Sequence, residues 1–237
     1  MKRVRLPVRR AALLLAATIF MIAATLPLQV ALSGLGIDAR GLSARSVSGS
    51  IWGGEMAEAY FGTLPLGNPA ARLVVWKLLL GEAQLVLDGG EGGAFRGKVT
   101  GYRNGFAIDD VDARLRAADL GLPGTGAILL DAVDLRFEDG LCVEAEGAVA
   151  TDILSGADGF GLPELSMTGV PECDGAVARL PLAGSAAGMN VDMALAMDAG
   201  GSLTGTIDLG GVEDAMAPAL AANGFVATGA GAYRLTF

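Results

Sequence analysis

A long uncharged stretch near the start of the chain constrains the fold more than any other feature. Residues 11–32 contain no charged side chain, and five basic residues stand within the ten positions before them. As a helix with a rise of ~1.5 Å per residue, this stretch is roughly 33 Å long, enough to cross a hydrocarbon core of about 30 Å. Because basic flanks stay on the cytoplasmic side, the sequence predicts a cytoplasmic segment at 1–10 and a single transmembrane anchor at 11–32.

A cleaved secretory signal is the alternative interpretation, since a basic start followed by an apolar core also describes such a signal. The apolar stretch is longer than the roughly 7–15 residues of a signal core, and no clean small-residue cleavage site ends it. Pro27 predicts a kink near the end of the span, which membrane helices tolerate. We therefore favour an uncleaved anchor, with residues 33–237 on the far side of the membrane from the basic start.

The composition of the chain argues against several functional classes. The chain has no histidine, which is the usual general base near neutral pH and a common zinc ligand. Its formal net charge is −9, and after the first ten residues 12 basic side chains stand against 26 acidic ones. Nucleic-acid binding requires a clustered basic surface, which this charge balance opposes. We expect a non-enzymatic protein with no cofactor, no metal site and no nucleic-acid partner.

Alternation of apolar and polar residues predicts a β-rich domain beyond the anchor. One hairpin turns at Asp139-Gly140, and another joins 191–198 to 203–209. A short helix is expected at about 217–222, followed by an Asn223-Gly224 stop signal. Further strands are expected at 45–52, 56–61, 70–76, 83–87, 94–102, 106–115, 165–169, 176–182 and 230–237. Because the 36 glycines are spread through these strands, we predict a mainly β fold: a curved, glycine-rich antiparallel sheet or sandwich.

The two cysteines, Cys142 and Cys173, both lie beyond the predicted anchor. An even count in an oxidising compartment favours a disulfide, and two free thiols are the alternative. Closing this loop would stabilise the fold by roughly 3 to 4 kcal/mol on the chain-entropy model. In the alternation pattern, Cys142 shares strand parity with Glu144 and Glu146 and faces away from the side of Val143.

Two tryptophans are the candidates for docking a partner protein. Trp52 and Trp76 are the only tryptophans in the chain, and large aromatic side chains anchor either a core or an interface. A carboxylate cluster at Asp109, Asp110 and Asp112 lacks the spacing of a calcium-binding loop, so a solvated strand edge is the simpler interpretation.

Several short motifs carry a resemblance to a known family. They are GLSARSVSGSIWGG at 41–54, LPLG at 64–67, FEDGLCVEAEG at 137–147, PECDG at 171–175 and LPL at 180–182. Together they resemble protein N of the general (type II) secretion pathway, the GspN family. The resemblance implies a single-span subunit of the bacterial inner membrane whose periplasmic domain, residues 33–237, serves the export of folded proteins across the outer membrane. It implies other subunits of the pathway as partners and brings no catalytic residue, so a scaffold or adaptor role is expected.

The same opening motif also resembles AsmA-like envelope proteins. These build curved sheets with an apolar groove for lipid, so a β-groove that binds or transfers lipid is the alternative function. Such a groove would leave one face of the sheet apolar and unfilled, whereas a scaffold would bury that face.

Overall fold

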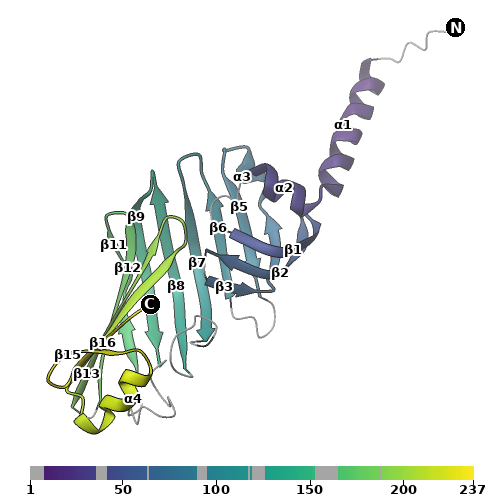
Figure 1. Cartoon of the computed structure of the whole chain (residues 1–237). Helices are drawn as coiled ribbons and strands as arrows, with labels where there is room; N and C mark the ends of the chain where they lie inside the picture. The colour runs from purple at the N-terminus through teal and green to yellow at the C-terminus, as the bar shows by residue number, and fades with distance from the viewer. Residues whose placement is uncertain are drawn as a thin grey trace.

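One continuous antiparallel sheet forms most of the molecule (Figure 1). The computed structural model describes residues 8–35, 42–62, 64–89, 95–116, 118, 126–152, 165–186 and 188–237. Within these residues the sheet has sixteen strands, and neighbouring strands follow chain order almost throughout. The strands are β1 (Leu42–Ser50), β2 (Gly53–Phe61), β3 (Leu64–Gly67), β4 (Ala70–Leu73), β5 (Ala83–Asp88), β6 (Phe95–Gly101), β7 (Gly105–Arg116), β8 (Ala127–Glu138), β9 (Leu141–Thr151), β10 (Met167–Gly169), β11 (Glu172–Asp174), β12 (Val177–Ala186), β13 (Met189–Asp198), β14 (Leu203–Gly210), β15 (Val226–Gly229) and β16 (Ala232–Thr236).

Short helices flank this sheet at both ends of the chain. They are α1 (Val8–Thr25), α2 (Leu28–Leu35), α3 (Val75–Leu78), the 3-10 turn η3 (Asp214–Met216) and α4 (Ala217–Ala222). The helix predicted at about 217–222 is confirmed as α4. The predicted strand at 70–76 is wrong in its second half, because the chain leaves the sheet after Leu73 and turns into α3.

The predicted span at 11–32 is unconfirmed, and the segment is divided into α1 and α2, in line with the kink expected at Pro27. Pro27 lies at the break, has no N–H to continue a helix, and forms an isolated bridge with Ser50. Beyond it, Leu28 and Leu32 are buried in the core of the β domain. Of the helices in the described ranges, none has both the length and the apolar run that a membrane crossing needs. The end of the predicted span, from Leu28 to Leu32, is therefore part of the folded domain.

Strand alternation and turn chemistry explain the sheet where it is regular. The β8–β9 hairpin turns through Asp139 (φ 51°) and Gly140 (φ 79°), and these two positive φ angles match the two-residue turn that suits twisted strands. The β13–β14 turn is held by the Asp198 carboxylate, which accepts hydrogen bonds from the N–H groups of Gly200 (2.8 Å) and Ser202 (2.9 Å). Both predicted hairpins are confirmed.

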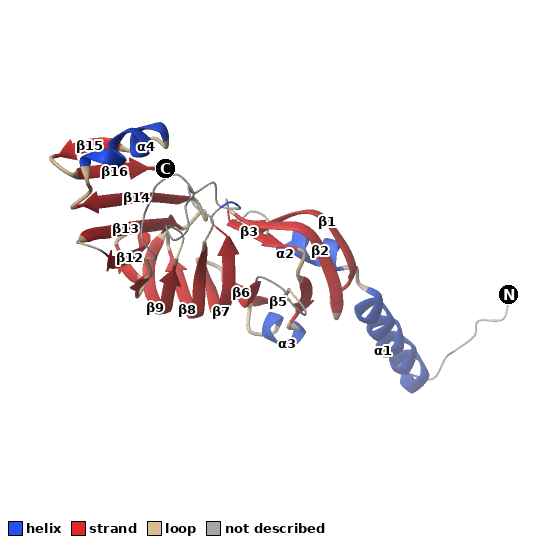
Figure 2. Cartoon of the chain, turned by 90° about the horizontal axis from the view of Figure 1, so that it is seen from below, coloured by secondary structure: helices blue, strands red, loops and turns tan. Residues whose placement is uncertain are grey.

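The apolar face of the sheet is covered because the first strands fold back across it. Strand β2 pairs with β4 only through Gly54 and Glu55, and its later residues pair with β3 instead. Its last residue, Phe61, packs with its ring centroid 5.4 Å from that of Phe106 in β7, and Phe106 stacks at 5.1 Å on Phe137 in β8. Figure 2 shows β1 to β3 apart from the run of β7 to β9, with the strand direction changing strongly toward β13 to β16. The predicted curvature is confirmed, in one open sheet rather than a sandwich of two.

Two turns that lie far apart in the sequence meet where the sheet curls. Gly62, after β2, contacts Gly201, in the β13–β14 turn, so closely that a Cβ on Gly62 would lie 1.9 Å from the Gly201 carbonyl oxygen. Both glycines have positive φ, at 57° and 77°. A side chain at position 62 is therefore excluded by backbone conformation and by contact with backbone atoms.

We expect Gly62→Ala to lower the free energy of unfolding by about 2 kcal/mol more than Gly67→Ala does. Gly67 also has a positive φ of 75°, but open space surrounds the position of its missing Cβ. Comparing the two variants thus separates the cost of a positive φ from the cost of the contact with Gly201. Urea titration of the full chain in detergent, followed by far-UV circular dichroism, measures both; equal losses would contradict the close approach of the two turns.

The two halves of the sheet are joined by a narrow connection. Strand β10 has three residues, which pair with Val149 to Thr151 of β9, while its other edge pairs with β12 only through Thr168 and Ala183. The rest of β9 has no ladder to β12 in the described residues. A covalent link near the other end of β9 supplements this short strand, as described below.

Candidate functional site

The end of the domain from which α1 leaves gathers three segments that are distant in sequence. The Ile51 N–H, in the β1–β2 turn, donates to the Leu26 carbonyl at 3.1 Å. The Leu73 N–H, just before α3, donates to the Ile51 carbonyl at 2.9 Å. Because backbone hydrogen bonds connect the three segments in a row, the end of α1, the β1–β2 turn and the start of α3 lie side by side. Figure 1 shows α1, α2 and α3 at this end.

A small apolar cluster fills the space beneath this end. Ala31, Ile51 and Leu73 are buried together, with Val75 and Leu78 packed against them. Next to this cluster, α2 sits close to the sheet because Gly54 has no side chain: a Cβ there would lie 2.8 Å from the Leu28 side chain. The cluster thus attaches α2 and α3 to the sheet.

Large apolar side chains cover the outside of the same end. Leu79, directly after α3, is 88% exposed, and Leu80 beside it is also exposed. Trp76 and Trp52 are 59% and 52% exposed, so neither ring is a core anchor. We call Trp52, Trp76, Leu79 and Leu80 the Trp–Leu patch. The sequence singled out the two tryptophans but missed the leucines, whose signal was the apolar run WKLLLG at 76–81.

The electrostatics of the patch differ from those of the rest of the chain. The sequence has no Asp or Glu between Glu58 and Glu82, although acidic residues outnumber basic ones overall. The Lys77 ammonium lies 5.2 Å from the centre of the Trp76 ring and 2.7 Å from a carboxylate oxygen of Glu82. The surface around Trp76 is thus apolar. Residues 59–81 add no carboxylate to it, and Glu82 is paired with Lys77.

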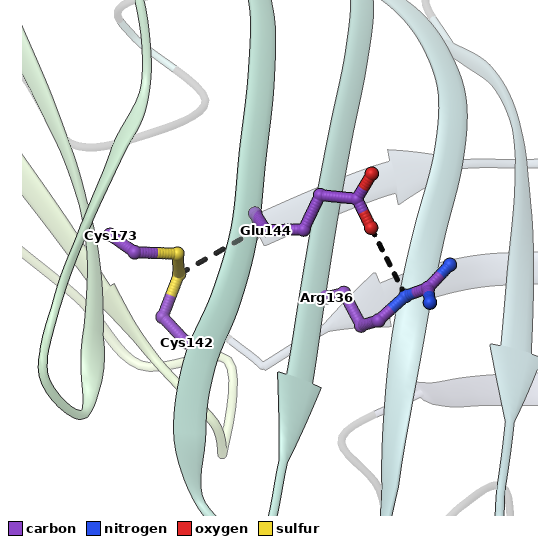
Figure 3. Close-up of a disulfide and its surroundings, with 4 residues drawn as sticks. All are labelled: Arg136, Cys142, Glu144 and Cys173. Carbon is purple, nitrogen blue, oxygen red and sulfur yellow. Dashed lines mark hydrogen bonds and ion pairs between the residues drawn. A yellow bond between two sulfur atoms is a disulfide. The ribbon is translucent and has the colours of Figure 1, made fainter.

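The disulfide expected between Cys142 and Cys173 is present, with a Cα–Cα distance of 5.3 Å (Figure 3). It joins β9 to β11, and the Cys142 N–H also donates to the Gly175 carbonyl at 2.9 Å. The bond therefore reinforces the junction between the two halves of the sheet. Beside it, Arg136 and Glu144 form an ion pair at 3.2 Å between β8 and β9.

Cys142 and Val143 lie on opposite faces of β9, as expected, but the buried face is that of Cys142 rather than that of Val143. Cys142 is buried in the core, whereas Val143 and Leu141 are exposed, so the apolar residues of this strand end face solvent. A register shift between Arg136 and Phe137 breaks the simple alternation beside the turn. Such irregularities change which face a side chain takes, and alternation alone does not reveal them.

Carboxylates in and beside the aspartate cluster bind nearby backbone and side-chain groups: Asp110 pairs with Lys98, and Asp112 and the neighbouring Asp134 bind backbone N–H groups. Asp134 accepts a hydrogen bond from the Asp110 N–H at 2.7 Å, and Asp112 accepts one from the Ala132 N–H at 3.1 Å. Asp110 and Ala132 both have positive φ at irregular points of the β7–β8 ladder. Burial raises the pKa of the Asp109 carboxyl, and a hydrogen bond donated by the Thr100 hydroxyl at 3.1 Å opposes that rise.

The aspartates of this cluster are not arranged as metal ligands. Within the described ranges, no group of three or more His, Cys, Asp or Glu side chains is placed to hold a metal ion. We interpret Asp112 and Asp134 as acceptors for N–H groups that the irregular pairing of β7 and β8 leaves free.

An apolar cavity of about 120 Å³ lies under the curved sheet. Side chains from both halves line it, among them Phe61, Leu66, Val111, Leu135 and Leu195, and of the described residues in its lining only Arg179 is charged. The guanidinium of Arg179 forms an ion pair with Asp174 at 2.9 Å. The concave face is thus largely filled, with a limited apolar space remaining.

Comparison with known families decides the identity of the chain. The model of the family described as type II secretion system (T2SS), protein N matches residues 40–236. The chain belongs to this family. The match covers the whole described β domain from β1 to β16, together with the disulfide and the Trp–Leu patch. No curated protein and no solved structure matches the chain. Membership in the T2SS protein N family indicates involvement in type II secretion and makes other subunits of that system plausible partners.

Proposed function

We propose that this chain is a non-catalytic subunit of the type II secretion system that is tethered to the inner membrane and acts as a scaffold or adaptor. The family match is the observation that carries the proposal, since it covers the whole β domain. The lack of histidine agrees with a role without acid–base chemistry.

The proposed tether is α1, with the N-terminus in the cytoplasm and the β domain in the periplasm. Leu13, Leu14, Leu15 and Met21 on α1 are exposed, and Figure 1 shows α1 projecting away from the sheet. An isolated helix with exposed apolar side chains is unfavourable in water. Its 18 residues rise about 27 Å, close to the thickness of a hydrocarbon core.

The proposed docking edge for another subunit is β15, at the end of the sheet far from α1. Among the described residues this strand pairs only with β16, all four of its residues are exposed, and its other edge forms no ladder with a described strand. A strand of a partner subunit could extend the sheet there by backbone hydrogen bonds.

Affinity capture of the full chain from detergent-solubilised membranes tests the adaptor role. We expect capture of other secretion subunits, and loss of secretion when the chain is deleted. Val226→Glu on β15 should weaken the capture, whereas Val143→Glu, also exposed but on an interior strand, should not. Unchanged secretion after deletion would refute the function, and a trimmed, freely soluble mature form would refute the tether.

A second candidate, lipid binding, is suggested by the apolar cavity under the sheet. The limited volume of about 120 Å³ suits part of one acyl chain rather than a whole lipid. Native mass spectrometry of the full chain, released from detergent, distinguishes the candidates. A phospholipid that stays bound, and is lost in Val111→Trp, would favour lipid binding; the bare protein mass would favour the adaptor alone.

A further inference from the structure

We infer that the Trp–Leu patch contacts the surface of the lipid bilayer, so that this end of the β domain lies on the membrane that holds α1. The inference rests on the proposed tether and adds a second, peripheral contact with the same membrane. Its occupant is the interfacial layer of the bilayer, not another protein.

The position of the patch is the first argument. The hydrogen bonds from Ile51 to Leu26 and from Leu73 to Ile51 hold the base of α1, the β1–β2 turn and α3 together. Between the end of α1 and the start of α2 only Leu26 and Pro27 intervene. A bilayer that contains α1 therefore begins within a few residues of the patch.

The chemistry of the patch is the second argument. Tryptophan concentrates at membrane–water interfaces because its ring is largely apolar and its N–H can bond to headgroups or water. The exposed leucines, Leu79 and Leu80, extend the same surface with aliphatic side chains suited to the acyl boundary. Four large apolar side chains at one end of a soluble domain form an unusual surface unless something covers it.

Charge supplies the third argument. A chain with a net charge of −9 is repelled by anionic lipid over most of its surface. Three of its four residues come from a segment with Arg72 and Lys77 and no carboxylate from residue 59 to residue 81, whereas Trp52 lies near Glu55. This end can therefore approach phosphate headgroups at lower electrostatic cost than other parts of the domain.

The two native tryptophans allow a direct test, because both belong to the patch and α1 contains none. The full chain is reconstituted in vesicles of phosphatidylethanolamine and phosphatidylglycerol, with or without brominated acyl chains, and co-flotation is checked first. We expect a blue-shifted emission that brominated lipid quenches. The single-tryptophan variants Trp52→Phe and Trp76→Phe assign the quenching to each ring.

Two variants serve as controls. In a Trp52→Phe/Trp76→Phe background, Val226→Trp puts the probe on β15 at the opposite end, and its emission should resist the brominated lipid. Leu79→Glu/Leu80→Glu should reduce quenching of Trp76 without reducing co-flotation, since both leucines are exposed and outside the core.

Each outcome bears on a distinct part of the proposal. Co-flotation with unquenched tryptophans overturns the bilayer contact and leaves the tether standing. Absence of co-flotation overturns the tether and the contact together. Protection of both rings by a co-purified secretion subunit, with no quenching by brominated lipid, assigns the patch to a protein partner and also overturns the inference.

Discussion

Removing the disulfide with Cys142→Ser/Cys173→Ser is expected to lower the free energy of unfolding by about 3 to 4 kcal/mol. The bond closes a loop across 31 positions in the unfolded chain as well as in the folded one. Without it the conformational entropy of the unfolded chain rises, and this rise lowers the free energy of unfolding. The folded state is also weakened at its narrowest point, because only the short β10 ladder and the hydrogen bond from Cys142 to Gly175 then link β9 to the β11–β12 region in the described sheet. Urea titration of the full chain in detergent measures the loss.

Two further measurements isolate the cross-link in this experiment. Cys142→Ala/Cys173→Ala removes the bond without placing a hydroxyl at the buried Cys142 position, so any excess loss in the serine variant is the cost of that polar group. Reductant should produce a similar loss in the natural chain and raise its mass by two hydrogens. A transition midpoint that reductant leaves unchanged would contradict the prediction.

Truncation of Phe106 is expected to cost about 3 to 5 kcal/mol in Phe106→Ala. The ring is buried between Phe61 of β2 and Phe137 of β8, with centroids 5.4 and 5.1 Å away. Its loss leaves a cavity between β2 and β8, which these strands cannot fill unless β2 moves toward β8. Phe106→Leu keeps most of the volume and should cost roughly 1 kcal/mol.

A double-mutant cycle tests whether β2 really crosses the sheet at this ring. The combination of Phe61→Leu and Phe106→Leu should differ from the sum of the single losses by about 0.5 to 1.5 kcal/mol, the coupling typical of an aromatic pair. Strictly additive losses would mean that the two rings do not touch and that the first strands do not cover the concave face.

The strands were predictable where one face of the sheet is buried and the other is exposed to solvent. In β13, Val191, Met193 and Leu195 are buried in alternation with exposed neighbours, which is the period-two pattern that the sequence displays. The two tight turns were predictable for a related reason, because Asp-Gly and Asp-x-Gly sequences favour the backbone angles that these turns need.

Other features depend on tertiary context that no local pattern contains. An uncharged segment looks the same whether lipid or protein covers it, so the docking of α2 through Leu28 was not apparent. The inverted orientation of Cys142 and Val143 follows from a register shift that alternation does not encode. Trp52 and Trp76 were identified as residues, but their shared location depends on long-range hydrogen bonds through Ile51.

The burial of Leu28 also determines how freely the domain could move on the proposed tether. Many anchored domains hang from a polar linker that lets them sample a wide volume of the surrounding space. Here Leu26 and Pro27 alone separate α1 from a helix that is packed into the core, and backbone hydrogen bonds fix both sides of that junction. Rotation of α1 would therefore turn the whole sheet with it. On the proposed tether, the binding surfaces of the domain would keep a fixed distance from the membrane and a fixed orientation, and a partner would have to bind them in that position.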